Sequence, residues 1–502
     1  MSSIGIDDSW YYLEIGVGAV LGMYWTLSHL LDQSQYDNSD TLIQQQRGEG
    51  RLRTVVLLQV LVMTPQRVGR MVWAGGIDAL VDAMRAPREK EVAMRAAATL
   101  LVLLDVSDAA VSKQHMRQAA DCRLVEVFSE ALMQSANSSA RGSSKRRQQS
   151  DPMLVSVCAA MAKQFALRTE YHQRMIDLAF LSALVGVTRQ SVSELELLRM
   201  LMESLVQLCT FLTAYRLPAA EENAMEVANP QMVQLLELGA VDTIAACIHQ
   251  DDQGVSPWGI GVLHEFVSQS VGKAQLAVSP GLVRWLCRRL ATGEYAYTNQ
   301  LILRSLWCLC MMRETAVAPA ALTEVAQPEN LWHVLAMFVS DNNAEAHYWS
   351  VALISRVSVL ASTHRWIIHS PLPQTMAGVA EVLMPDSRLT LMPEMASIIS
   401  RLCHSIDVTP IMAECPTIAT MCVRLLTADA ESAHLLAIMA VINAAVTSRG
   451  FLQLLMADDA IKTRLVELAL ANGSSSGPTQ SYAAKGLVAL MYAGQVDAKD
   501  VV

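Results

Sequence analysis

Charged and aromatic side chains are scarce in this sequence of 502 residues. Charged residues make up 17% of it and aromatic residues 5%, whereas 52% is hydrophobic. Long hydrophobic runs are scarce as well, because only one segment approaches the ~20 residues that cross a bilayer. The other apolar residues, chiefly Leu, Ala, Met and Val, occur in short blocks. This pattern favours helices buried on more than one side over strands or repeated membrane spans.

Positive charge and paired cysteines are also lacking. The formal net charge is −10, which argues against a broad surface for nucleic acid. None of the ten cysteines forms a CxxC pair, and most lie within apolar helical stretches such as LWCLC at 306–310. We therefore expect buried free thiols in a reducing compartment.

The motifs of the common enzyme classes are absent. The chain contains no P-loop, GxGxxG or HExxH sequence, and its eleven histidines are scattered. Neighbouring pairs such as Cys403 and His404 are expected to be helix neighbours rather than catalytic dyads. The sequence therefore predicts a non-enzymatic chain without a cofactor or a metal site.

A repeated pattern dominates the sequence after residue 50. A small-residue turn, such as WAGGI at 73–77, is followed by an apolar helix, a polar gap and a longer helix that is apolar on most of its surface. The longer helices are predicted near residues 54, 92, 153, 197, 257, 298, 346, 392, 433 and 481, and the last six are spaced 41 to 48 residues apart. A helix that is apolar on both sides must lie between neighbouring repeats.

This period resembles that of armadillo and HEAT repeats. The segments WAGGIDALVDAMR, LELGAVDTIAACI, LAVSPGLVRWLCRRL and SYAAKGLVALMYA look like parts of armadillo units. The resemblance implies an all-α fold, a right-handed α-solenoid of armadillo-like repeats over residues 51–495, preceded by an N-terminal hydrophobic helix. HEAT-like geometry is an alternative for the less regular units.

Two polar stretches interrupt the predicted solenoid. Residues 134–152 are rich in Ser and Arg and cannot bury an apolar face, so we expect an inserted flexible loop. Within it Ser144 and Ser150 are candidate phosphorylation sites, because a phosphate there would reduce the local positive charge. Residues 215–230 form a second, shorter insertion.

The stretch from residue 10 to residue 31 is a candidate membrane helix. Aromatic residues near both ends suit the two interfaces, and a GxxxG pair lets helices approach closely. The residues that carry this hypothesis are Trp10, Tyr12, Gly18, Gly22 and Trp25. Residues 1–31 would then form the anchor and residues 32–50 a polar stalk. No Lys or Arg precedes Arg47, which argues against a cleaved signal. A helix that caps the first repeat is the alternative.

Charge gives this candidate anchor an orientation. Acidic residues precede it, whereas Arg47, Arg51 and Arg53 follow it, which favours a repeat domain on the cytosolic side. The layout resembles that of membrane-anchored armadillo proteins of the mitochondrial outer membrane. The expected location is therefore a membrane, with the repeats in a reducing compartment, and the cytoplasm is the alternative.

The resemblance implies that the longer helices line a concave surface that binds protein. Family members that bind basic peptides carry a ladder of Trp and Asn there, but Met311 stands four residues after Trp307, where Asn would be needed. Three arginines recur instead on successive long helices. They form either a basic stripe for an acidic extended peptide or helix, or intramolecular pairs and caps. The candidate binding residues are Trp258, Asn299, Arg304, Trp307, Trp349, Arg356, Arg401 and Asn443.

Three functions fit this architecture. The leading prediction is a protein-binding scaffold or adaptor tethered to an organelle membrane. The second is an accessory structural subunit of a large membrane complex, such as one in mitochondria. The third is a soluble cytosolic adaptor whose first helix caps the repeats.

Overall fold

The structure is a computed structural model that describes most of the chain after residue 50. The described residues are 51–63, 65–85, 90–106, 108–140, 151–177, 180–191, 193–214, 230–249, 254–267, 281–291, 296–310, 318–340, 344–382, 391–405, 408–427, 431–457, 459–470 and 477–494. The chain divides into two compact units, one up to residue 215 and the other from residue 216. This boundary coincides with the shorter insertion expected at 215–230.

Several predicted features lie outside the described residues. They are the candidate membrane helix with Trp10, Tyr12, Gly18, Gly22 and Trp25, the stalk at 32–50, and the candidate phosphorylation sites Ser144 and Ser150. Within the described part of the chain, no single helix is both long and apolar enough to cross a membrane. One pair, Pro230–Glu237 with Ala240–His249, meets that test together but is bent by 69°.

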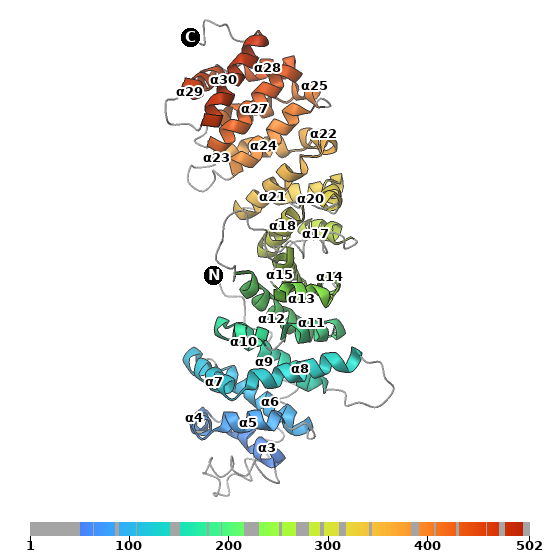
Figure 1. Cartoon of the computed structure of the whole chain (residues 1–502), viewed down its shortest axis with the longest axis vertical. Helices are drawn as coiled ribbons and strands as arrows, with labels where there is room; N and C mark the ends of the chain where they lie inside the picture. Colours follow the sequence, from blue (N-terminus) through green and yellow to red (C-terminus); the bar gives the residue numbers. More distant parts are fainter. Residues whose placement is uncertain are drawn as a thin grey trace. The chain divides into compact units, whose positions relative to one another are not determined.

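Unit 1 repeats a group of three helices (Figure 1). The first helices are α4 (Pro65–Trp73), α7 (Ala109–Asp121) and α10 (His172–Asp177), the last preceded by the 3-10 turn η1 (Thr169–Tyr171). The second helices are α5 (Gly76–Met84), α8 (Leu124–Ala140) and α11 (Phe180–Gln190), and the third are α6 (Lys90–Leu104), α9 (Pro152–Ala166) and α12 (Leu195–Ala214). The helix α3 (Arg51–Val62) precedes the first group and packs against α6 as a third helix would.

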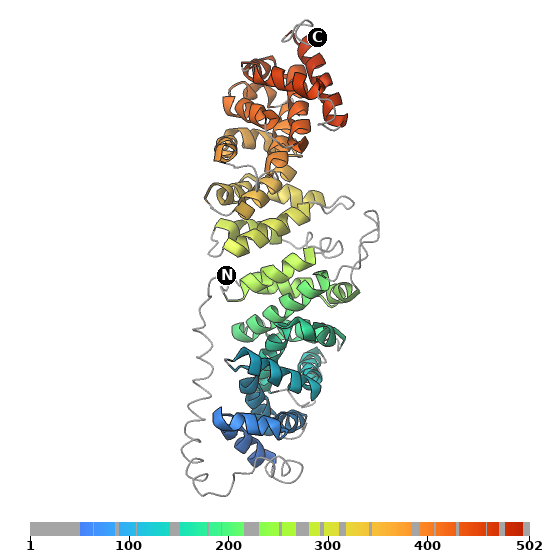
Figure 2. The same cartoon turned by 90° about the vertical axis from the view of Figure 1, so that its left-hand side faces the viewer.

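Unit 2 contains the same order of helices, and Figure 2 shows these helices coloured from green to red along the sequence. Its first helices are α13 (Pro230–Glu237), α19 (Ala318–Val325), α22 (Ala361–His369), α25 (Thr409–Met412) and α28 (Arg449–Leu455). The second helices are α14 (Ala240–His249), α17 (Leu282–Ala291), α20 (Pro328–Ser340), α23 (Leu372–Val382), α26 (Pro416–Thr427) and α29 (Ala460–Leu470). The third are α15 (Ser256–Val267), α18 (Ala296–Cys310), α21 (Ala344–Val357), α24 (Leu391–His404), α27 (Glu431–Thr447) and α30 (Gly477–Tyr492).

The third helices form a continuous layer within each unit. In unit 1, α3, α6, α9 and α12 pack in chain order, and in unit 2 the same holds from α15 through α30. This layer confirms the all-α solenoid, because each of the ten predicted longer helices has a counterpart and the described residues contain no strand. The extra short helix in front of most pairs makes the repeat a three-helix, armadillo-like unit rather than a two-helix HEAT unit.

A residue with positive φ precedes several of the second helices. Gly75 (φ 87°), Gly239 (φ 75°) and Gly281 (φ 76°) stand immediately before α5, α14 and α17, and Arg123 (φ 67°) occupies the same place before α8. Glycine adopts this conformation without the steric cost of a Cβ atom. The small-residue turns seen in the sequence are therefore the junctions between first and second helices.

Apolar packing between layers holds unit 1 together. Phe128 of α8, Phe165 of α9 and Phe180 of α11 are fully buried. The ring centroid of Phe128 lies 5.6 Å from each of the other two. Aromatic pairs at this spacing add to the free energy gained by burying their area. This cluster ties the second-helix layer to the third-helix layer.

The insertion expected at 134–152 begins later than predicted. Helix α8 continues to Ala140, so residues 134–140 are helical rather than a loop. The cause is a close approach to α11, because a Cβ on Gly186 would lie 2.7 Å from Cβ of Ala136. The Gln190 side chain also donates from Nε2 to the carbonyl of Ala136 at 2.7 Å. The small and polar residues of this segment thus form a contact between α8 and α11.

Candidate functional site

Two of the three predicted tryptophans and one predicted arginine meet on two neighbouring third helices of unit 2. Trp307 lies on α18 and Trp349 on α21, with their ring centroids 5.4 Å apart at an angle of 65°. The Arg304 guanidinium lies 5.2 Å from the Trp349 ring centroid, within cation–π distance. Tyr348 contacts Trp349 at 4.9 Å between centroids. We call Arg304, Trp307, Tyr348 and Trp349 the aromatic–arginine cluster.

All four side chains of the cluster are half-buried. Burial raises the pKa of the Tyr348 phenol, and the nearby carboxylate of Glu394 raises it further, so the hydroxyl stays protonated. Among the described residues, the Arg304 guanidinium has no carboxylate partner. The cluster therefore combines partly exposed ring surface with a guanidinium whose N–H groups can still donate to a carboxylate.

The other two predicted arginines are engaged within the chain. Arg356 of α21 donates from Nε to the Cys310 carbonyl at the end of α18, at 2.9 Å. Arg401 of α24 donates from Nη1 to the Ser355 carbonyl and to Ser358 Oγ near the end of α21. Burial lowers the pKa of Arg401, but an arginine remains charged in proteins.

These contacts cap the end of the preceding third helix. The last carbonyls of a helix have no partner within it, and a cation there also interacts favourably with the helix dipole. Thr447 of α27 continues the arrangement by donating from Oγ1 to the Cys403 carbonyl of α24 at 3.1 Å. Of the two alternatives that the sequence left open for the arginines, the structure shows capping for Arg356 and Arg401.

The other three predicted binding residues differ in how far they are exposed. Trp258 on α15 and Asn443 on α27 are half-buried. Asn299 is only 5% exposed, because it lies on the same side of α18 as the fully buried Ile302 and Leu303. Its amide oxygen is buried without a hydrogen-bond partner in the described structure. Asn299 is therefore not part of the outer surface that carries Arg304.

A half-buried histidine lies next to the aromatic–arginine cluster. His264 of α15 places Nδ1 3.4 Å from Ser305 Oγ on α18. Burial lowers the pKa of His264 to about 4, and the positive charge of Arg304 contributes in the same direction. His264 is therefore neutral near pH 7, and Arg304 is the cation at this position.

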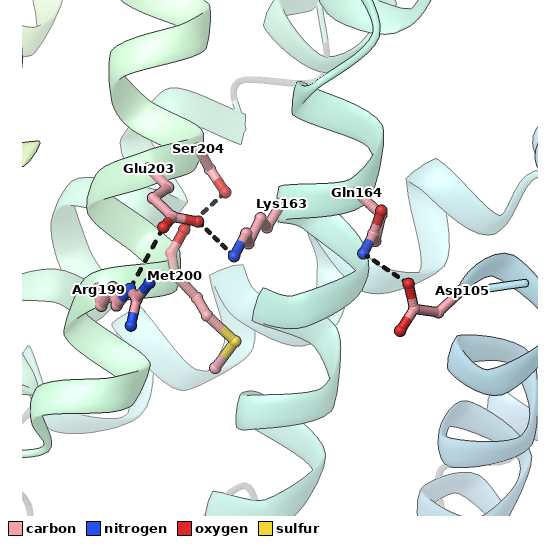
Figure 3. Close-up of polar contacts among 7 residues, drawn as sticks. All are labelled: Asp105, Lys163, Gln164, Arg199, Met200, Glu203 and Ser204. Carbon is pink, nitrogen blue, oxygen red and sulfur yellow. Dashed lines mark hydrogen bonds and ion pairs between the residues drawn. The ribbon is translucent and has the colours of Figure 1, made fainter. Parts of the chain in front are cut away.

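The third helices of unit 1 carry a row of polar contacts that sequence analysis missed (Figure 3). Glu203 of α12 receives Lys163 of α9 at 2.5 Å and Arg199 of α12 at 3.4 Å. Gln164, the next residue on α9, donates from Nε2 to Asp105 after α6 at 3.4 Å. We call Asp105, Lys163, Gln164, Arg199 and Glu203 the polar row. Two consecutive residues of α9 thus reach toward both neighbouring third helices.

The polar row could have been recognised from its spacing. Lys163 and Glu203 each interrupt an apolar helix, and 203 minus 163 is 40 residues, about one repeat. Opposite charges one repeat apart on two longer helices are expected to face each other. The Glu203 side chain is only 7% exposed, and its two cationic neighbours are 31% and 39% exposed. A buried carboxylate requires such partners.

The cysteines are poor candidates for chemistry. All ten are free thiols, and seven of them are buried. Burial raises the pKa of Cys158, Cys247, Cys310 and Cys422 to about 12. Thiols with such pKa values are protonated and unreactive at neutral pH. The described residues also contain no group of three or more His, Cys, Asp or Glu arranged to hold a metal ion.

Comparisons with known proteins identify the architecture. No family model and no curated protein matches the sequence. An engineered protein of known structure aligns with 90% of this chain and 98% of its own, at a TM-score of 0.60 and 14% identity. A chain from a structure on a phosphorylation switch between cadherin and β-catenin aligns over 90% and 94%, at a TM-score of 0.57 and 14% identity. A designed armadillo repeat protein covers 54% of this chain at a TM-score of 0.39.

The fold is an α-solenoid of armadillo-like repeats. The two long alignments carry this conclusion together with the repeated three-helix groups. At 14% identity they establish the fold and leave the ligand to be argued from the residues of this chain.

Proposed function

We propose that this chain is a non-enzymatic protein-binding scaffold whose aromatic–arginine cluster binds an acidic extended segment or helix of a partner protein. The observation that carries the proposal is the position of Arg304 5.2 Å from the Trp349 ring, beside Trp307 on the neighbouring third helix. Half-buried Trp and Arg side chains are the residue types that contribute most to binding energy in protein interfaces.

Charge favours an acidic ligand at this cluster. Arg356 and Arg401 donate to helix ends, whereas Arg304 keeps its planar array of N–H donors for a carboxylate. His264 is uncharged near pH 7 because its pKa is about 4, so it does not change the net charge of the cluster. The rings of Trp307 and Trp349 offer apolar area next to this cation. The expected ligand therefore has an acidic residue close to an apolar one.

A peptide-display selection with the full chain tests the proposal. We expect selected peptides to be enriched in Asp or Glu beside an apolar residue. Binding of a selected peptide should weaken about tenfold or more in Arg304→Gln and in Trp349→Ala, the effect of removing an interface hot spot. The matched control is Trp332→Ala on the second helix α20, because Trp332 pairs with Trp366 at the same 5.4 Å. Equal losses in control and test variants, or no acidic enrichment, would refute the site.

We also propose that residues 1–31 tether the scaffold to an organelle membrane, on the support of the apolar and aromatic pattern of residues 10–31. Deletion of residues 1–31 followed by cell fractionation tests this proposal, with the mitochondrial outer membrane as the first location to examine. Loss of membrane association is the expected result. Unchanged solubility with lowered thermal stability would instead indicate a helix that caps the repeats.

Purification from native membranes in mild detergent separates the scaffold from a structural subunit. A scaffold is expected to be recovered with sparse partners, whose amounts depend on the aromatic–arginine cluster. Recovery in a stoichiometric assembly that is unchanged in Trp349→Ala would favour the accessory subunit of a membrane complex.

A further inference from the structure

The first described part of unit 1 is basic within an acidic protein. Residues 51–77 contain four arginines and no acidic residue or lysine, whereas the formal net charge of the whole chain is −10. Two of these arginines, Arg67 and Arg70, lie on α4 and are exposed. Neither has a carboxylate partner among the residues that the structure describes.

Helix α4 presents these arginines together with an exposed tryptophan. Residues 67, 70 and 73 are three apart, so their side chains follow one another along one side of the helix. Trp73 is 87% exposed, whereas Met71 and Val72 on the opposite side are 0% and 6% exposed. The Gln118 side chain of α7 donates from Nε2 to the carbonyl of Val72 at 3.3 Å. The helix is thus fixed in unit 1 by its apolar side while the basic, aromatic side stays in water.

The acidic residues that follow α4 do not neutralise this surface. Burial raises the pKa of the Cys122 thiol to about 11, and the neighbouring carboxylate of Asp78 raises it in the same direction. Asp82 pairs with Arg85 at 3.2 Å. Both carboxylates therefore interact with residues other than Arg67 and Arg70.

We infer that the exposed side of α4, formed by Arg67, Arg70 and Trp73, rests on an anionic membrane surface. Arginines near the surface of an anionic leaflet bind its lipid headgroups, and tryptophan partitions to the level of those headgroups. A single exposed Trp flanked by two cations matches a flat charged interface better than a deep apolar site.

The position of α4 in the chain supports this assignment. Nineteen residues, 32–50, separate the candidate anchor from α3. A flexible chain of that length spans about 25 Å between its ends. A tether at residues 10–31 would therefore hold the start of unit 1 within reach of the lipid surface. The inference deepens the proposed tether, and the experiment below allows each to fail separately.

Flotation of the full chain with lipid vesicles tests the inference. Vesicles of phosphatidylcholine alone are compared with vesicles that also contain phosphatidylserine, for the wild type and for Arg67→Gln/Arg70→Gln. The extra partitioning due to phosphatidylserine should fall about thirtyfold in this double variant, as expected for two basic residues near an anionic surface. It should also fade at high salt. The control Arg288→Gln/Arg449→Gln removes the same charge from exposed positions in unit 2 and should bind as the wild type does.

Trp73 gives a second, independent readout. Brominated lipids in the phosphatidylserine vesicles should quench part of the tryptophan fluorescence of the wild type, and this part should be absent in Trp73→Phe. Equal partitioning of the double variant and the wild type, or equal losses in the control, would overturn the inference. So would unchanged quenching in Trp73→Phe, which is also the result expected if the first 31 residues covered α4.

The tether and the α4 surface have different signatures in this assay. A chain that binds phosphatidylcholine vesicles without any gain from phosphatidylserine retains the tether and overturns the α4 surface. A chain that binds only the anionic vesicles, through Arg67 and Arg70, supports the α4 surface and overturns the tether.

Discussion

The third helices of the two units use polar side chains in different ways. In unit 1, Lys163, Glu203 and Arg199 pair with one another through their side chains, so the charges of the polar row are largely balanced within the chain. In unit 2, Arg356 and Arg401 donate to backbone carbonyls at helix ends, and Arg304 lies against a tryptophan. The third helices therefore carry ion pairs between side chains in unit 1, and in unit 2 arginines that contact backbone carbonyls or a tryptophan ring.

This difference shows how a repeat architecture separates stability from binding. An ion pair between side chains satisfies both partners, whereas a guanidinium that caps a carbonyl keeps its charge without a carboxylate. A cation that lies against a ring also keeps most of its donors available. This difference supports the binding site proposed for unit 2 and a structural role for the polar row of unit 1. The predictions below begin with the largest expected effect on stability.

Acid should destabilise the helices around α15 in unit 2. His264 has a folded-state pKa of about 4 against an ordinary value of 6.5, so the unfolded chain binds more protons between these values. Stability is therefore fully present above about pH 6.5 and is lost as the pH falls toward 4, by up to about 3 kcal/mol. Hydrogen exchange of the α15 and α18 amides at several pH values measures this loss. His264→Gln should remove that part of the pH dependence, and an unchanged dependence in the variant would contradict the assignment.

Replacing Arg401 should weaken the packing of α24 on α21. Arg401→Met keeps the apolar stem but leaves the Ser355 carbonyl without its charged donor. Hydrogen bonds to charged groups contribute about 2 kcal/mol, and we expect a loss of that size in the opening free energy of α21 and α24. Arg449→Met, at an exposed position, is the matched control and should change little. No difference between the two variants would argue against the capping role.

Removing one charge from the polar row should cost less and should depend on salt. Lys163→Met leaves Glu203 with Arg199 alone, at 3.4 Å. Because Lys163 is 31% exposed, we expect a loss of about 1 kcal/mol in the opening free energy of α9 and α12. A double-mutant cycle with Glu203→Gln gives the coupling energy, which should shrink at high salt. A coupling that salt leaves unchanged would contradict the electrostatic account.

Replacing the residue before α8 should stabilise unit 1 slightly. Arg123 has a φ of 67°, whereas the residue at the same place before α5, α14 and α17 is glycine. Arg123→Gly removes the steric cost of this conformation but increases the entropy of the unfolded chain, for a net gain of about 0.5 kcal/mol. Chemical denaturation monitored at α7 and α8 measures the gain. Gly239→Ala introduces a Cβ atom at the corresponding position before α14 and should therefore destabilise unit 2.

Much of the architecture could be predicted from the sequence, because the doubly apolar longer helices allow few arrangements. The ten predicted helix positions match the structure because a helix that is apolar on most of its surface must lie between neighbouring repeats. The short first helices were missed because segments such as 172–177 and 409–412 are too brief to show a helical period. The loop expected at 134–140 is a helix because Gly186 on another helix admits Ala136, which no local pattern reveals.

The candidate site was less predictable than the fold. The period of the repeats aligned Trp307 with Trp349, so their meeting could be foreseen. Asn299, by contrast, is only 5% exposed, and the spacing of the repeats did not reveal that burial. Whether an arginine caps a helix or remains available depends on where the preceding third helix ends. That end is set by packing between repeats rather than by local sequence.

Hydrogen exchange of the full chain with and without a selected acidic peptide tests the central claim most directly. The account predicts that the peptide slows exchange in α18 and α21, which carry the aromatic–arginine cluster, and leaves α9 and α12 unchanged. Protection confined to α9 and α12 would contradict the account. Equal protection in Trp349→Ala and in the wild type would contradict it as well.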